Sequence, residues 1–209
     1  MCIRDRSNII AHGTTGIALA NISHYLSALL LHQLVLSTFP SLTLSAKPAH
    51  LARKFALLTA FLHVLSPAGL FLSSPYGESL FSLLNFSGFL LYVEAKKRIG
   101  FNADVHVLAS GVLLALATSV RSNGLLSAAV YLYDVVIVVA AGKASLSSRR
   151  LICRFLCTGV AGLLVACGAV VPQWIAYGEY CVADSGAEVR PWCQKLPPSI
   201  YSFVQDYYW

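Results

Sequence analysis

Long apolar stretches recur along the whole chain and are separated by short polar connections. An α-helix needs about 20 residues to cross about 30 Å of hydrocarbon. Most stretches approach this length, and the third and fourth are shorter. No internal repeat and no separate soluble domain interrupts the series. The pattern predicts six membrane-spanning helices, at Gly16–Leu36, Phe55–Leu72, Ser79–Val93, Val105–Val120, Leu125–Ala141 and Ile152–Val171.

The composition agrees with this interpretation. Of the 209 residues, 57% are hydrophobic and 11% are charged, whereas soluble domains contain about 25% charged residues. Mean hydropathy is +0.68. The net charge of +6 does not indicate nucleic-acid binding, because lysine and arginine form short clusters between apolar spans without a nucleic-acid motif. The expected fold class is all-α, a polytopic transmembrane helical bundle.

The basic residues predict the orientation of this bundle. Ten of the 15 lie in alternate connections, namely Lys47, Arg53, Lys54, Lys96, Lys97, Arg98, Lys143, Arg149, Arg150 and Arg154. The positive-inside rule places those connections in the cytosol. The segments SSPYGES and RSNG and the tail at 172–209 then share the lumenal or exterior face. We expect the functional residues on that face.

The segment SSPYGES contains Tyr76 and Glu78, directly before the third predicted span. Glu78 and Ser79 could cap that helix, where its dipole favours a carboxylate. Alternatively, Glu78 faces a substrate, because acidic groups within apolar segments are often functional. Upstream, Pro67 is expected to bend the second span, and Gly69 beside it permits close packing.

The connection TSVRSNG offers a second candidate. Arg121 could extend its side chain to water at the membrane surface. It could instead bind a lipid-linked phosphate, since a guanidinium matches two phosphate oxygens. Asn123 with Gly124 is typical of a turn, and we include Asn123 among the substrate-binding candidates.

Asp134 is the only acidic residue deep inside a predicted span. It is either functional or hydrogen-bonded to a neighbouring helix, and His63 and His106 are candidate partners. The histidines show no metal-ligand spacing. Cys153, Cys157 and Cys167 are interpreted as ordinary helix residues, so no metal site is predicted.

The tail is rich in aromatic residues and amides. Trp and Tyr at a bilayer edge usually anchor a protein at the interface, but aromatic faces beside amides also suit sugar rings. On the second interpretation the substrate-binding candidates are Gln173, Trp192, Tyr201 and Gln205. Cys181 and Cys193 could form a disulfide if the tail faces an oxidising lumen.

The stretches SPAGLFLSSPYGESLFSLLNFSG, TSVRSNG and RPWCQKLPPSIYSFVQDYYW together resemble the PIG-V family of GPI mannosyltransferases, from about Asn8 to Trp209. The resemblance implies a GT-C-type membrane enzyme of the endoplasmic reticulum. It would transfer mannose from dolichyl-phosphate mannose, on the lumenal side, to the GPI-anchor precursor as its second mannose. The implied partners are these two glycolipids, membrane lipid and a membrane partner subunit. No cofactor, nucleotide or metal is implied.

The chain departs from the family at its ends. Residues 1–7 resemble a translated adapter sequence, so we expect a transmembrane region at 8–171 and a truncated lumenal loop at 172–209. The family's early acidic lumenal loop has no counterpart here. The resemblance therefore implies a fragment whose main catalytic carboxylate lies in a missing amino-terminal loop, which leaves the catalytic residue unassigned.

The residues alone also fit two other functions. A transporter or lipid-handling protein would use Asp134 and the broken span at Pro67 as a translocation path. A non-catalytic membrane subunit would use small residues such as Gly159, Ala161 and Gly162 to associate with a partner helix.

Overall fold

The computed structural model of the chain describes residues 3–39, 48–66, 74, 76–140, 149–182 and 191–194. The described residues form six α-helices and no strand, which confirms the all-α prediction. The helices are α1 (Ile3–Thr38), α2 (Pro48–Val64), α4 (Gly77–Lys97), α5 (Phe101–Val120), α6 (Ala129–Ala140) and α7 (Arg149–Tyr177). Three shorter elements are η2 (Ser122–Ala128), η4 (Gly178–Val182) and η5 (Pro191–Gln194).

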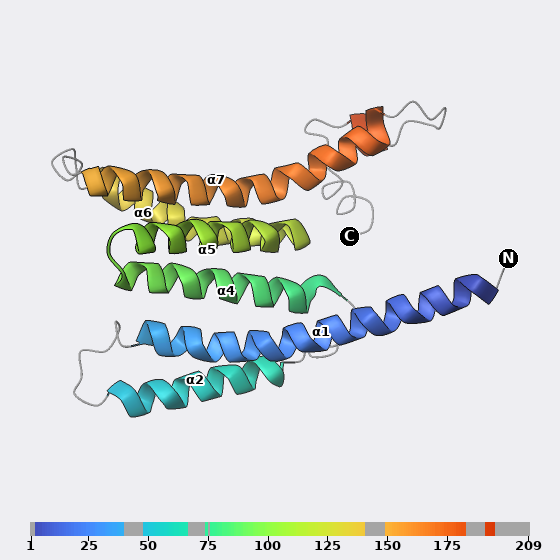
Figure 1. The fold of residues 1–209 in the computed structure, drawn as a ribbon, viewed down its shortest axis with the longest axis horizontal. Coiled ribbons are helices and arrows are strands. Elements are labelled where there is room, and N and C mark those ends of the chain that lie inside the picture. Colours follow the sequence, from blue (N-terminus) through green and yellow to red (C-terminus); the bar gives the residue numbers. More distant parts are fainter. Residues whose placement is uncertain are drawn as a thin grey trace.

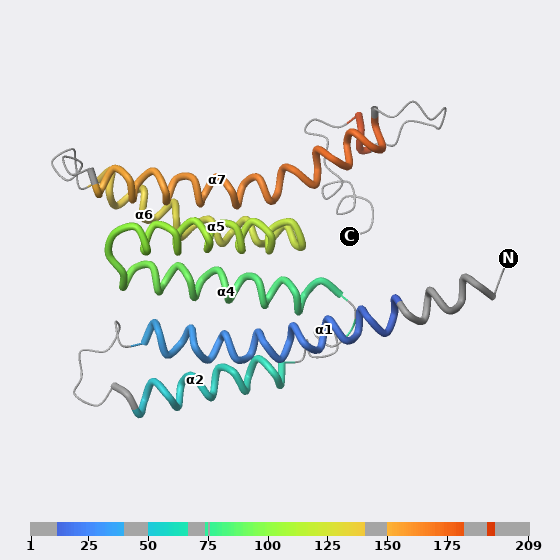
Figure 2. The backbone as a smooth tube through the Cα atoms, viewed as in Figure 1, coloured from blue at the N-terminus to red at the C-terminus, as the bar shows by residue number. Residues whose placement is uncertain are grey.

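The long helices lie side by side in the order α2, α1, α4, α5 and α7, and α6 packs against α7 (Figure 1). Helices that follow one another in the chain run in opposite directions. The tube in Figure 2 shows that α7 bends in its orange-red carboxyl-terminal part. This helix contains Pro172, which removes one backbone hydrogen bond and commonly kinks a helix.

The core lies between α4, α5, α6 and α7. Its buried side chains are Ala95, Val107, Leu114, Tyr131, Ala161 and Val165. Small residues let α5 and α7 approach closely, because a Cβ atom added at Gly111 would lie 2.8 Å from Ala161. A hydrogen bond of 2.5 Å between the hydroxyls of Ser110 and Tyr131 connects α5 to α6 inside this core.

Four of the described segments are long and apolar enough to cross a membrane: His12–Thr38, Phe101–Val120, Ser122–Ala140 and Arg150–Cys181. They correspond to the first, fourth, fifth and sixth predicted spans. Helices α2 and α4 correspond to the other two, which stay predictions as membrane spans. The chain is therefore an integral membrane protein built as a helical bundle.

Most helix boundaries differ from those that hydropathy predicted, and the largest difference is at α1, which begins at Ile3 instead of Gly16. Three further differences have a local cause. Helix α2 ends at Val64 instead of Leu72, because Ser66 precedes a proline, which disfavours helical backbone. The predicted bend at Pro67 and the packing at Gly69 lie outside the described residues. The fifth span begins as the 3₁₀-helix η2 before it becomes α6. Helix α7 continues through Pro172 to Tyr177 instead of ending at Val171.

The two ends of the bundle differ in charge. The carboxyl ends of α1, α4 and α6 gather with the amino ends of α2, α5 and α7 at the left of Figure 1. We call this the basic end, since it carries Arg53, Lys54, Lys96, Lys97, Arg98, Arg150 and Arg154. The opposite end contains the amino end of α4 and the carboxyl ends of α5 and α7.

Candidate functional site

Two of the predicted site residues form an ion pair at the opposite end. Nη1 of Arg121 lies 2.9 Å from Oε1 of Glu78, and the two side chains are 46% and 29% exposed. The sequence singled out both residues, but it did not show that they meet. The structure therefore joins the amino end of α4 and the turn after α5 into one charged, partly exposed site.

The backbone brings this pair together. Gly77 is next to Glu78 and Val120 is next to Arg121, and a Cβ atom added at Gly77 would lie 3.1 Å from Cγ1 of Val120. The missing side chain at Gly77 lets the ends of α4 and α5 approach closely. Glu78 lies in the first turn of α4, and Arg121 is the C-cap of α5. Each charge is favoured there by the dipole of its own helix.

A tight turn presents Arg121 outward. Its backbone is extended, its N–H donates to the carbonyl of Ala117, and the N–H of Gly124 donates to the carbonyl of Arg121, both over 2.9 Å. A Cβ atom at Gly124 would lie 2.6 Å from the Cα of Thr118, so only glycine fits this approach. Asn123 is exposed in the same turn, two residues after Arg121.

The capping alternative for Glu78 is not what the structure shows. The N-cap of α4 is Tyr76, and its side chain makes no capping hydrogen bond. Ser79 is buried, and its Oγ has no hydrogen-bond partner among the described residues. The carboxylate of Glu78 binds Arg121 instead.

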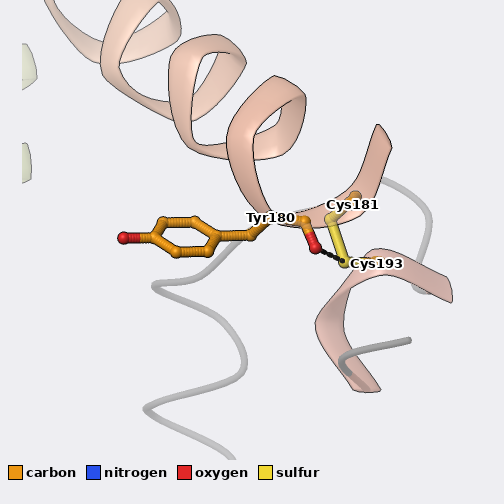
Figure 3. Close-up of a disulfide and its surroundings, with 3 residues drawn as sticks. All are labelled: Tyr180, Cys181 and Cys193. Atoms are coloured by element: carbon orange, nitrogen blue, oxygen red, sulfur yellow. Dashed lines mark hydrogen bonds between the residues drawn. A yellow bond between two sulfur atoms is a disulfide. The ribbon is translucent and has the colours of Figure 1, made fainter. Parts of the chain in front are cut away.

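The carboxyl-terminal part of α7 reaches the same end of the bundle (Figure 1). Gln173 is half-buried on this part of the helix. Cys181 and Cys193 form a disulfide that ties η5 to η4, which directly follows α7, with their Cα atoms 5.7 Å apart. The Tyr180 carbonyl oxygen lies 4.0 Å from the sulfur of Cys193. Figure 3 shows that the Tyr180 ring points away from the disulfide.

The remaining tail candidates have different outcomes. Trp192 is 5% exposed, so the structure does not present its ring on the surface for stacking. Tyr201 and Gln205 lie outside the described residues. As contacts to a substrate, all three stay predictions.

Asp134 has partners that the sequence did not predict. Its carboxylate accepts a hydrogen bond of 2.6 Å from the Tyr92 hydroxyl and forms an ion pair of 2.5 Å with Lys96. The suggested histidine partners are wrong. His63 instead contacts the Ser27 hydroxyl at 3.0 Å, and Nδ1 of His106 lies 2.7 Å from the Asn102 carbonyl. Of the two interpretations of Asp134, the structure supports an interhelical hydrogen bond.

Cys153 and Cys157, which the sequence indicates as ordinary helix residues, lie beside a carboxylate in the structure. One donor atom each from Asp104, Cys153 and Cys157 lies within 4.8 Å of the other two. The spacing of four residues between the cysteines was the available signal, because it places both on one helix face. Nη1 of Arg154 lies 3.5 Å from Asp104, so the carboxylate is already paired with a cation.

Comparison with known proteins decides the family. The sequence pattern of the family described as mannosyltransferase (PIG-V) matches residues 6–209. The chain belongs to this family. The matched range includes both members of the Glu78–Arg121 pair and the disulfide.

The relatives of this PIG-V chain are longer proteins. It is 39% identical to GPI mannosyltransferase 2 of Aspergillus oryzae over 93% of this chain and 44% of the relative. It is 38% identical to GPI mannosyltransferase 2 of Chaetomium globosum, over 96% of this chain and 44% of the relative. It is 32% identical to GPI alpha-1,6-mannosyltransferase 2 of Rattus norvegicus, over 74% of this chain and 34% of the relative. The chain thus spans less than half the length of these relatives. No solved structure matches it.

Proposed function

We propose that the whole protein to which this chain belongs is a mannosyltransferase of GPI-anchor biosynthesis. It would transfer mannose from dolichyl-phosphate mannose to the GPI precursor as its second mannose, in an α-1,6 linkage. The observation that carries this proposal is the 39% identity to GPI mannosyltransferase 2 of Aspergillus oryzae over 93% of the chain. The linkage is that in the name of the rat relative, GPI alpha-1,6-mannosyltransferase 2.

The Glu78–Arg121 pair fits one part of this reaction. When mannose leaves dolichyl-phosphate mannose, the departing dolichyl phosphate gains negative charge that a positioned cation stabilises. Arg121 is half-exposed and already held in one orientation by Glu78 at 2.9 Å. We assign Arg121 to the donor phosphate and Glu78 to positioning Arg121. The base that accepts the proton of the acceptor hydroxyl is not assigned.

Two observations support a lumenal site in the endoplasmic reticulum. The basic end lies opposite the ion pair in the bundle. Cytosolic loops of membrane proteins are enriched in lysine and arginine. The Cys181–Cys193 disulfide lies on the ion-pair side, and disulfides persist in oxidising compartments. Both agree with a transfer reaction on the lumenal face.

The experiment uses the full-length protein in cells depleted of their own GPI mannosyltransferase 2. Mass spectrometry of the lipid-linked GPI intermediates should show conversion of the one-mannose species to the two-mannose species. Cells that cannot make dolichyl-phosphate mannose serve as the donor control and should show no conversion. Accumulation of the one-mannose species despite normal protein abundance would contradict the proposal.

A further inference from the structure

The basic end contains a cavity that the mannosyl-transfer site does not use. It has a volume of about 280 Å³ and lies where the carboxyl end of α4 meets the amino ends of α5 and α7. Gly100, with a φ of +81°, makes the tight turn between α4 and α5 that brings these ends together. Four cationic side chains line the cavity: Lys96, Arg98, Arg150 and Arg154.

Two of these cations are held in place by the fold. Nη2 of Arg154 donates to the carbonyl of Ala95 over 3.3 Å, and Nη1 lies 3.5 Å from Asp104. Lys96 is paired with Asp134. Arg98 and Arg150 are exposed beside them. Among the described residues, only two carboxylates, those of Asp104 and Asp134, pair with these four cations. The wall of the cavity therefore has a net positive charge, which favours an anionic ligand.

The neighbouring surface is apolar. Ile99 and Phe101 flank the turn and are 82% and 80% exposed. A second cavity of about 200 Å³ lies between α6 and α7 and shares Lys96, Leu151 and Arg154 with the first. Its apolar wall is formed by Val135, Ile137, Val138, Leu151 and Phe155. Asp134, which is paired with Lys96, and Thr158 complete its lining. A charged cavity that continues along an apolar wall matches a ligand with an anionic head and a hydrocarbon chain.

We propose that this pair of cavities binds an anionic phospholipid. Its phosphate would lie among Arg98, Arg150 and Arg154, and one acyl chain would lie between α6 and α7. Basic pockets between membrane helices are suited to such headgroups. The site is separate from the proposed donor site, which lies at the opposite end of the bundle.

The test places the purified full-length protein in nanodiscs of phosphatidylcholine alone or with phosphatidylinositol. Retained lipid is measured by native mass spectrometry, and stability is measured as the midpoint of thermal unfolding. Phosphatidylinositol should raise the midpoint of the wild type. The double variant Arg98→Gln/Arg150→Gln should lose this effect and bind the lipid about 30-fold more weakly, since each cation near a membrane surface adds about 1 kcal/mol.

The matched control is Arg53→Gln/Lys54→Gln. It removes the same charge from exposed residues at the basic end but outside the two cavities, and it should bind phosphatidylinositol like the wild type. If both double variants lost phosphatidylinositol binding equally, surface charge alone would attract the lipid, and the proposal would fail. Equal stabilisation by inorganic phosphate would also overturn it, because the acyl chain would then contribute nothing.

Discussion

Glu78 and Arg121 show why a charged pair at a membrane surface needs a functional test as well as a structural one. Exposed ion pairs contribute only about 0.2–1 kcal/mol to stability, and Arg121 is 46% exposed. The pair is therefore a weak stabiliser, and a strong effect of its loss on activity would point to chemistry.

Reversing the charges separates the two roles. The variant Glu78→Arg/Arg121→Glu retains an opposite-charge pair at the same approach of α4 and α5, although each charge then opposes its helix dipole. We expect its thermal unfolding midpoint to stay within a few degrees of the wild type, measured by fluorescence-detected size exclusion. A matched control, Lys97→Gln, removes one partner of an exposed 2.8 Å pair with Glu94 at the basic end. Unfolding of the reversed variant alone would show that the pair is structural.

The sequence predicted these two residues, and it missed their pairing for a physical reason. Polar residues at the ends of apolar spans can be recognised one by one, because hydrocarbon penalises charge. Which of them touch depends on how helices pack. Asp134 illustrates the limit, since its partners Tyr92 and Lys96 come from α4 and no spacing along the chain indicates them.

At the level of helices, close packing by small residues holds α5 against α7. A Cβ atom at Gly168 would overlap the carbonyl oxygen of Ala115, whereas Gly159 on the same helix has no neighbour within 4 Å. We expect Gly168→Ala to destabilise the protein by about 1–3 kcal/mol, because the helices must move apart. Gly159→Ala should be neutral or stabilising by about 0.5–1 kcal/mol, since glycine is unfavourable inside a helix. Chemical denaturation in detergent measures both, and equal effects would contradict this packing.

The sequence predicted the presence of the helices better than the residues at which they begin and end. Apolar length predicted the six helices, because a backbone in hydrocarbon must satisfy its hydrogen bonds internally. The 3₁₀ start of the fifth span was missed, since it depends on the contact of Gly124 with Thr118 from the preceding helix. The continuation of α7 past Pro172 was also missed, because membrane helices tolerate proline when neighbouring groups compensate.

For the whole molecule, the proposed orientation rests on the two unlike ends of the bundle. The exposed Cys153 lies near the amino end of α7, at the basic end, and Cys181–Cys193 lies beyond its other end. In sealed microsomes, a membrane-impermeant maleimide should modify Cys153 from outside. Cys193 should react only after detergent and a reductant are added. The variant Cys153→Ser should lose the modification seen in sealed microsomes, which identifies Cys153 as its source. Labelling of Cys193 in sealed, reduced microsomes would contradict the proposed orientation.

Arg121 is proposed to bind the phosphate of the mannose donor. The most direct measurement is transfer of mannose from purified dolichyl-phosphate mannose to the one-mannose GPI precursor by microsomes containing the full-length protein. We expect Arg121→Lys and the charge-reversed variant to lose activity by about a hundredfold, because neither keeps a guanidinium aimed at the leaving phosphate. Lys97→Gln should transfer at the wild-type rate. Wild-type rates in all variants, at matched protein abundance, would contradict the claim.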